Sequence, residues 1–216
     1  MTENAKKTIV CHQCKTNDCL RHYPEGVPDY CQSKKYGDII ERSKSEYTKP
    51  DVAGIHLATA KILKEGGFDW TRVQQCIEFA REIKASKVGL AVCIGLIREG
   101  REMARYLERA GFEVISVACM IGALTPQETG IPEEWQTSAD LACNPVAQAE
   151  IMNREGTQLN LIYGLCVGHD TLFIRYSKAP VTYVVVKDTV TGNNPTAALL
   201  STFHRIKLGQ IYKKRS

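Results

Sequence analysis

The sequence predicts an α/β domain with an open, mainly parallel sheet of about five strands and helices on both faces, preceded by a cysteine-rich arm. Two observations support this prediction. Short apolar runs alternate with helical patterns after residue 87, and the nine cysteines fall into two groups of four with one left over. The 216 residues are 44% hydrophobic and 24% charged, which is typical of a globular protein. We therefore expect a metal-binding arm at residues 1–50 and one globular α/β unit at residues 51–216.

The arm holds four cysteines in a segment with too few apolar residues to order itself by burial. Their pattern is Cys11-x2-Cys14-x4-Cys19-x11-Cys31. Four thiolates within so short a segment are typical of a metal centre around which the chain folds. Zinc and an iron–sulfur cluster both accept four thiolates, and the spacing matches neither the paired CxxC zinc pattern nor the ferredoxin runs, so both stay open. His12 and His22 are substitute ligands, although a surface position is the commoner role of such residues.

Two helical patterns follow the arm. Asp51 is placed to cap the first, which ends at Gly66-Gly67, and Asp69 is placed to cap the second. The apolar positions recur at helical spacing, as Val52, Ile55, Thr59, Ile62 and Leu63 and then as Val73, Cys76, Ile77, Ala80 and Ile83. Because Cys76 lies inside the second apolar stripe, we predict that it is a core residue.

From residue 87 onward, strand and helix patterns alternate. The predicted strands are 87–93, 112–119, 138–142, 158–165 and 181–187, and the helices between them are 96–110, 145–155 and 169–178. Asn144-Pro145 is typical of an N-cap followed by a first-turn proline, Gly156 ends that helix, and Asn194-Pro195 opens a last one. Near-continuous apolar strands separated by helices indicate a parallel sheet covered on both faces, of the flavodoxin-like or Rossmann-like kind.

The second group of cysteines recurs once in each strand–helix unit. Cys93, Cys119, Cys143 and Cys166 each end a predicted strand or begin the next helix, at spacings of 26, 24 and 23 residues. The carboxyl edge of a parallel sheet is where ligands bind, and a glycine soon after three of these thiols leaves backbone N–H groups free to face a cluster sulfur. We therefore predict a metal or cofactor site at this edge. Four strand tips span about 14 Å, so the loop of Cys119 or Cys143 must bend inward, or three thiols bind and leave one position open.

The segment Cys166-Val-Gly-His169-Asp170 suggests a second use of one thiol. A helix N-terminus lowers the pKa of a nearby thiol, which suits a nucleophile as well as a metal ligand. His169 and Asp170 are candidate catalytic partners of Cys166, although Asp170 fits an N-cap equally well. Asp188, at the end of the fifth predicted strand, is a candidate for supporting the site from outside it.

The net charge of +4 is concentrated in the C-terminal segment. Five cations and no acid follow Asp188, namely Arg205, Lys207, Lys213, Lys214 and Arg215, and without them 23 basic and 24 acidic residues remain. A nucleic-acid-binding protein carries its cations as a surface patch interleaved with aromatics, so we expect a solvated basic end and no nucleic-acid partner.

Patterns that the chain lacks narrow its location and function. We find no secretory signal pattern and no apolar run of the roughly 18 residues that span a bilayer, so we expect a cytoplasmic protein without membrane contact. In that reducing compartment, cysteines favour metal or redox chemistry over disulfides. The phosphate-loop pattern GxxxxGKS/T, GxGxxG after the first strand and HExxH do not occur.

Several segments together resemble an uncharacterised family. They are the N-terminal CxxC with Cys19 and Cys31, Val92-Cys-Ile-Gly95, Cys143-Asn-Pro-Val-Ala-Gln-Ala-Glu150, Gly164-Leu-Cys-Val-Gly-His-Asp170 and Tyr176-Ser-Lys-Ala-Pro-Val181. The family consists of cysteine-rich proteins, mostly from anaerobic prokaryotes, with a domain of unknown function and the label of predicted metal-binding proteins. The resemblance implies metal binding, is compatible with oxygen-sensitive iron–sulfur chemistry, and supplies no reaction.

These observations lead us to expect an iron–sulfur protein that carries out electron transfer or other redox chemistry at the strand-edge thiols. We expect one or two clusters, for example of the 4Fe–4S type, and a redox partner or a small molecule as the binding partner. One alternative is a zinc-binding structural or interaction module whose α/β domain binds a small ligand. Another is a thiol-dependent enzyme that uses Cys166.

Overall fold

The computed structural model describes residues 11–15, 18–21, 30–136 and 140–212. The chain divides into two compact units, Met1–Ala60 and Lys61–Ser216, with the boundary inside helix α3 (Pro50–Gly66). None of the helices in these ranges is long and apolar enough to cross a membrane.

The first unit is helical where the structure describes it. It contains 3₁₀ turns at Cys11–Gln13 and Asp18–Arg21, the short helix α1 (Gln32–Lys35), helix α2 (Gly37–Glu46) and the start of α3. Helix α3 begins at Pro50, so Asp51 is not its cap as predicted but lies in its first turn, where the helix dipole favours a carboxylate. The helix ends at Gly66, as its pattern predicts.

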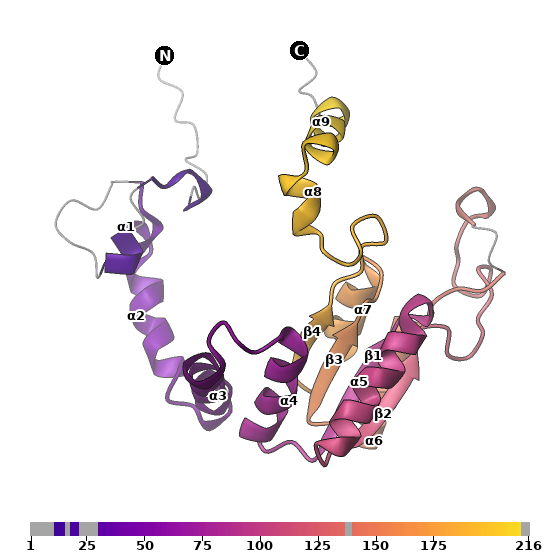
Figure 1. The fold of residues 1–216 in the computed structure, drawn as a ribbon, viewed down its shortest axis with the longest axis horizontal. Helices are drawn as coiled ribbons and strands as arrows, with labels where there is room; N and C mark the ends of the chain where they lie inside the picture. Colours follow the sequence, from indigo (N-terminus) through magenta and orange to yellow (C-terminus); the bar gives the residue numbers. More distant parts are fainter. Residues whose placement is uncertain (1–10, 16–17, 22–29, 137–139, 213–216) are drawn as a thin grey trace. The chain divides into compact units, whose positions relative to one another are not determined.

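The second unit is built on a four-stranded parallel sheet (Figure 1). Its strands are β1 (Lys87–Val92), β2 (Glu113–Ala118), β3 (Leu159–Tyr163) and β4 (Val181–Val185), in the order β2-β1-β3-β4. Val88 pairs with Val114 of β2 on one side and with Leu159 of β3 on the other. The chain therefore passes from β1 to β2 in one direction and returns to β3 in the other, so the order reverses between β1 and β3.

Helices cover both faces of this sheet (Figure 1), which confirms the predicted α/β class. Helices α4 (Arg72–Glu82) and α5 (Ile97–Arg109) pack on the face that carries Val88, Leu90 and Val92. Helices α6 (Pro145–Glu155) and α7 (His169–Tyr176) pack on the opposite face, against Ala91, Val117 and Ile162. Alternate strand residues thus enter separate cores, which is why the strands show apolar runs rather than an alternating pattern.

Cys76 is a core residue, as predicted. Its side chain is 2% exposed and lies among the residues that α4 buries against the sheet. Burial raises the pKa of this thiol, so Cys76 stays protonated at neutral pH.

The predicted five-strand count is not confirmed. The third candidate strand, 138–142, lies partly outside the described residues, and Asp140, Leu141 and Ala142 form a bend and a loop. Ala142 donates its backbone N–H to the carbonyl of Leu124, so this stretch folds back on its own loop instead of joining the sheet.

Two helix predictions also need correction. Thr71, rather than Asp69, caps α4, because the Thr71 side chain accepts a hydrogen bond from the Gln74 N–H. The last predicted helix is two helices, α8 (Thr196–Leu200) and α9 (Thr202–Ile211), which are separated by the extended backbone of Ser201. By contrast, Asn144 caps α6 ahead of Pro145, and Gly156 ends that helix with a φ of 70°, both as predicted.

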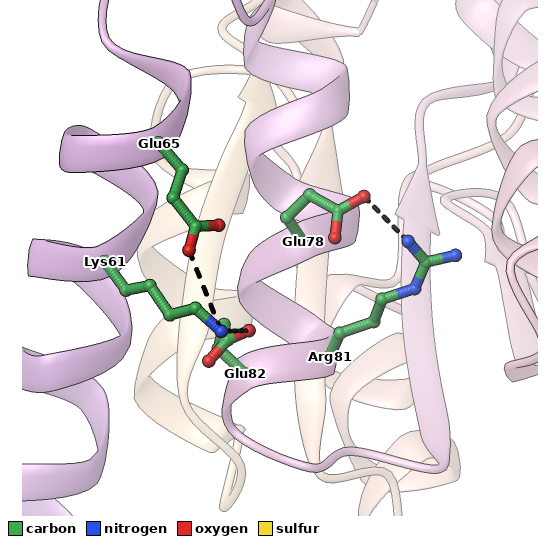
Figure 2. A network of polar contacts seen from close by, with 5 residues as sticks. All are labelled: Lys61, Glu65, Glu78, Arg81 and Glu82. Atoms are coloured by element: carbon green, nitrogen blue, oxygen red, sulfur yellow. Dashed lines mark hydrogen bonds and ion pairs between the residues drawn. The ribbon is translucent and has the colours of Figure 1, made fainter.

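Ion pairs connect the end of α3 to α4 (Figure 2). Lys61 lies 2.6 Å from Glu82 and 4.0 Å from Glu65, and Glu78 pairs with Arg81 at 2.7 Å along α4. The hydrogen bond from Lys61 to Glu82 raises the pKa of Lys61. Because these side chains are exposed or partly exposed, each pair contributes little to stability.

Candidate functional site

Three thiols lie side by side at the carboxyl edge of the sheet. Cys93 follows β1 directly and Cys119 follows β2 directly, while Cys166 lies three residues beyond the end of β3. Backbone hydrogen bonds continue the sheet through the first two, from Cys93 N to Tyr163 O at 3.1 Å and from Cys119 N to Val92 O at 2.8 Å. The strand order places Cys93 and Cys166 on the two sides of the switch point, which is the ligand-binding position in open α/β sheets.

Cys143 reaches the same place through a long loop rather than from a strand. The loop leaves β2 at Cys119 and returns to it, because Asn144 N donates to the Cys119 carbonyl at 2.6 Å. The Asn144 side chain then caps α6 by accepting from Ala147 N at 3.0 Å. This closure brings the thiols of Cys119 and Cys143 within hydrogen-bond reach of each other, which is the inward bend that the strand spacing required.

Hydrogen bonds run from one thiol to the next. Cys119 donates to the sulfur of Cys93, and this bond is the main reason why the pKa of Cys93 falls to about 5 while that of Cys119 rises. Ile94 N donates to Cys119 Sγ at 3.3 Å, and the Gly95 N–H supports the Cys93 thiolate. Burial raises the pKa of Cys143.

Lys187 connects two of the thiols. Its Nζ lies 3.1 Å from Cys93 Sγ and 3.3 Å from Cys166 Sγ. Lys187 follows β4, two strands away from β1 and thus about 10 Å across the edge, a distance that a long side chain can bridge. The bond to Cys93 raises the pKa of Lys187, and the ammonium in turn helps to lower that of Cys93. At neutral pH the site therefore holds a thiolate paired with an ammonium.

Gln148 of α6 bonds to the two strands that carry Cys93 and Cys119. It is fully buried on α6, and its Nε2 donates to Val117 O at 2.7 Å and to Val92 O at 3.4 Å. These carbonyls belong to the ends of β2 and β1, so one amide fixes the spacing of the strands that carry Cys119 and Cys93. Its Oε1 is buried without a hydrogen-bond partner.

The Cys166, His169 and Asp170 side chains do not form a catalytic triad. No hydrogen bond joins the His169 ring to Cys166, and His169 Nδ1 is buried without a partner. The Asp170 carboxylate accepts bonds from Gly168 N at 3.0 Å, Thr171 N at 2.7 Å and the Tyr183 hydroxyl at 3.0 Å. The N-cap of α7 is Gly168, so the N-cap interpretation of Asp170 is wrong, and Asp170 stabilises the start of the helix from within its first turn.

The other predicted residues lie away from this cluster or outside the described ranges. Asp188 accepts bonds from Val190 N and Thr191 N, both close to 3 Å, and so orders its own loop. His22 lies outside the described residues. In the first unit, Cys11 and His12 belong to one 3₁₀ turn, Cys19 to the other, and Cys31 precedes α1. Cys14 N donates to Cys11 O at 3.1 Å.

No ready-made site for a single metal ion is found in the part of the chain that the structure describes. Within those ranges, no three cysteine, histidine, aspartate or glutamate side chains surround one point where an ion could bind. At the sheet edge, the thiols are hydrogen-bonded to one another, and the Lys187 ammonium lies between Cys93 and Cys166. These thiols therefore do not surround a common point.

A cleft of about 650 Å³ is lined partly by Arg72 of α4 and Glu99 of α5, the two helices that pack on one face of the sheet. Its wall includes Leu96, Tyr163, Val186 and the loop 192–195. The lining includes neither Lys187 nor any of Cys93, Cys119, Cys143 and Cys166, and Cys93 and Cys119 are buried in the core on the α6 and α7 side of the sheet.

Sequence reasoning missed Lys187 and Gln148. The signal for Lys187 was its position at the end of the fifth predicted strand, at the same edge as the thiols. A polar residue on α6 at a position that packs against the sheet was the signal for Gln148.

Comparison with known proteins shows two similarities. Residues 31–184 match the family described as "Protein of unknown function (DUF1847)", a range that contains Cys31 and all four strand-edge cysteines. The chain is also 37% identical over 171 residues to "Uncharacterized protein MJ0455" of Methanocaldococcus jannaschii, which covers 79% of this chain and 88% of that protein.

Proposed function

Because the chain belongs to the DUF1847 family of proteins of unknown function, we propose its function from the chemistry of the site: an iron–sulfur protein that transfers electrons. The cluster, of the 4Fe–4S type, would be held by Cys93, Cys119, Cys143 and Cys166. The observation that carries this proposal is that four reduced thiols, which come from the three loops after β1, β2 and β3, and one lysine meet at the switch point of the sheet. When bound, such a cluster accepts and releases electrons.

The arrangement of the sulfurs favours a cluster over a single zinc ion at this edge. Zinc requires its sulfur ligands at about 2.3 Å from one point, in a tetrahedron. Thiolates that hold a cluster bind separate irons, so they need not converge so closely. The strand-edge thiols lie near one another without surrounding a common point, which suits the second case.

The surrounding groups suit a negatively charged centre. The Lys187 ammonium offsets part of the thiolate charge, and the N–H groups of Ile94 and Gly95 bond to thiol sulfurs. Hydrogen bonds to sulfur and nearby cations raise the reduction potential of such centres. Gln148 holds two of the ligand-bearing strands at a fixed spacing.

The N-terminal cysteines supply a second proposed centre. Cys11, Cys14, Cys19 and Cys31 offer four thiolates within a short segment, and a metal would order that segment as burial cannot. Zinc and an iron–sulfur cluster are both compatible with this arm, so a zinc-binding structural module is the alternative here.

One observation favours a second candidate function, thiol-based catalysis. The low pKa of Cys93, to about 5, makes it a thiolate at neutral pH. This places the nucleophile at Cys93 rather than at Cys166, because Cys93 receives bonds from Cys119 and Lys187 together. A metal-free protein in which iodoacetamide modifies Cys93 first, already at pH 6, is the result that favours this function.

The test of the iron–sulfur proposal is metal and sulfide analysis after purification without oxygen. We expect a brown protein that contains iron and acid-labile sulfide in similar amounts. Replacing Cys93 and Cys166 together by alanine should remove about half of the iron if both centres are clusters. Cys76→Ala is the matched control, because Cys76 is a thiol in the core and should leave the iron unchanged. A colourless protein with zinc and no sulfide contradicts the proposal.

A further inference from the structure

The two C-terminal helices carry large apolar side chains that lie exposed. On α8, Leu200 is 75% exposed, and on α9 Phe203 is 70% exposed, while Tyr212 just beyond it is 77% exposed. Leu199, Ile206 and Ile211 are each more than half exposed. Single exposed apolar residues are normal on a protein surface, but a group of them on two adjacent short helices is typical of an interaction surface.

This surface follows Lys187 along the chain, because α8 begins nine residues after it. The loop 192–195, which borders the cleft, leads directly into α8 at Thr196. Figure 1 shows α8 and α9 continuing beyond the end of β4, the strand that precedes Lys187. Two other exposed apolar residues lie along the same edge, Val167 next to Cys166 and Val190 in the loop after Lys187. A protein bound to α8 and α9 would therefore lie on the side of the sheet where the strands end and the thiols are located.

The charge of this segment selects the kind of partner. Arg205 and Lys207 are exposed on α9, and the sequence after Asp188 contains five cations and no acid. A second copy of the chain would bring the same cations together, which opposes self-association. Nucleic-acid interfaces are dominated by polar and cationic groups, whereas apolar side chains predominate here. An apolar centre with a cationic margin instead fits a protein surface that has an apolar centre and an acidic margin.

We propose that α8 and α9 form the docking surface for an acidic electron-carrier protein. This inference rests on the proposed iron–sulfur function. In the docked complex one electron passes from the reduced carrier to the oxidised cluster, so that the carrier is oxidised by one electron and the cluster is reduced by one. Arg205 and Lys207 attract and orient the carrier, and Phe203 and Ile206 supply the buried contact.

The test measures binding of a purified acidic ferredoxin to the full chain at low and at high salt. We expect R205E/K207E to weaken binding at least tenfold at low salt, because exposed charges steer such complexes, and to reduce the salt dependence. F203S/I206S should weaken binding by a similar factor at every salt concentration, since it removes apolar contacts. R101E/R109E is the matched control, with two exposed arginines on α5 reversed to glutamate, and should bind like the wild type.

The docking proposal is overturned if both α9 variants bind the ferredoxin as tightly as the wild type. It is also overturned if the wild type binds a single-stranded oligonucleotide more tightly than the ferredoxin, or forms a dimer that F203S/I206S dissociates. Iron and sulfide are measured on the same samples. If the protein holds its cluster but both α9 variants bind the ferredoxin like the wild type, only the docking surface is rejected. Absence of the cluster rejects the proposed function, and the same titration still reports on docking.

Discussion

Lys187 makes the most specific contact of the site, and replacing it with methionine tests that contact. Methionine keeps the length of the side chain and removes the ammonium that lies 3.1 Å from Cys93 Sγ. An opposite charge at this distance lowers the pKa of an acid by about 1–3. The Cys119 hydrogen bond and the Gly95 N–H remain, so the pKa of Cys93 should rise from about 5 only part of the way toward that of an ordinary thiol, to about 7.

The direction of the pKa shift of Cys93 determines the pH range in which the substitution has an effect. A lowered pKa means that the thiolate is present above the folded-state value and is lost as the pH falls through it. In metal-free wild-type protein at pH 6, about 90% of Cys93 is thiolate if its pKa is about 5, whereas about 10% is thiolate if the pKa is about 7. Lys187→Met should therefore slow the alkylation of Cys93 about tenfold at pH 6 and have little effect above pH 9.

The assay is the rate of Cys93 modification by iodoacetamide as a function of pH, read by peptide mass spectrometry. Lys178→Met is the control, because Lys178 is an exposed lysine whose backbone N–H, not its ammonium, makes the local hydrogen bond. If the pH profile of Cys93 is the same in the wild type and in Lys187→Met, the ammonium does not stabilise the thiolate and the described geometry is wrong.

Three further substitutions test the support of the site, each by urea denaturation. Gln148→Leu should lower the free energy of unfolding by about 1–3 kcal/mol, because it removes the buried amide that donates to the Val117 carbonyl at 2.7 Å, whereas the Val92 carbonyl keeps its bond from Cys119 N; an unchanged midpoint contradicts this. Asn144→Ala should cost about 1 kcal/mol by removing the cap of α6, and it should speed the alkylation of Cys143, whose loop Asn144 anchors. Gly89→Ala should cost at least about 1–3 kcal/mol, because a Cβ there would meet the buried amide of Asn160 and lie 2.6 Å from Met152 Sδ; a stability equal to that of the wild type would show that this part of the core is loose.

The parts of the fold that sequence predicted correctly are those that local chemistry determines. Asn144 and Gly156 mark the ends of α6 because an N-cap and a left-handed C-terminal residue require those residue types. Asp69 and Thr71 are both acceptable caps, and the choice depended on the direction in which the chain enters α4. Leu141 and Ala142 are apolar like strand residues, but Ala142 donates its backbone N–H to Leu124 of its own loop, and this is a tertiary effect that pattern alone does not contain.

In the site, too, some features follow from sequence spacing and others from contacts between distant residues. The spacing of Cys93, Cys119 and Cys166 predicted their common edge, because one strand–helix unit separates each from the next. Their bonding to Lys187 joins residues up to 94 positions apart, and a lysine at the end of a strand is too common to single out in advance. Gln148 could not be assigned either, since its role depends on two carbonyls of strands that only the sheet order brings together.

A cluster at the strand-edge thiols can be detected on its own in a chain that lacks the N-terminal centre. The measurement is the iron and acid-labile sulfide content of the variant with both Cys11 and Cys14 replaced by serine, purified without oxygen. We predict iron and sulfide in similar amounts and a broad visible absorption that a reductant bleaches. A folded, colourless variant without sulfide would place all the metal in the arm and contradict the claim.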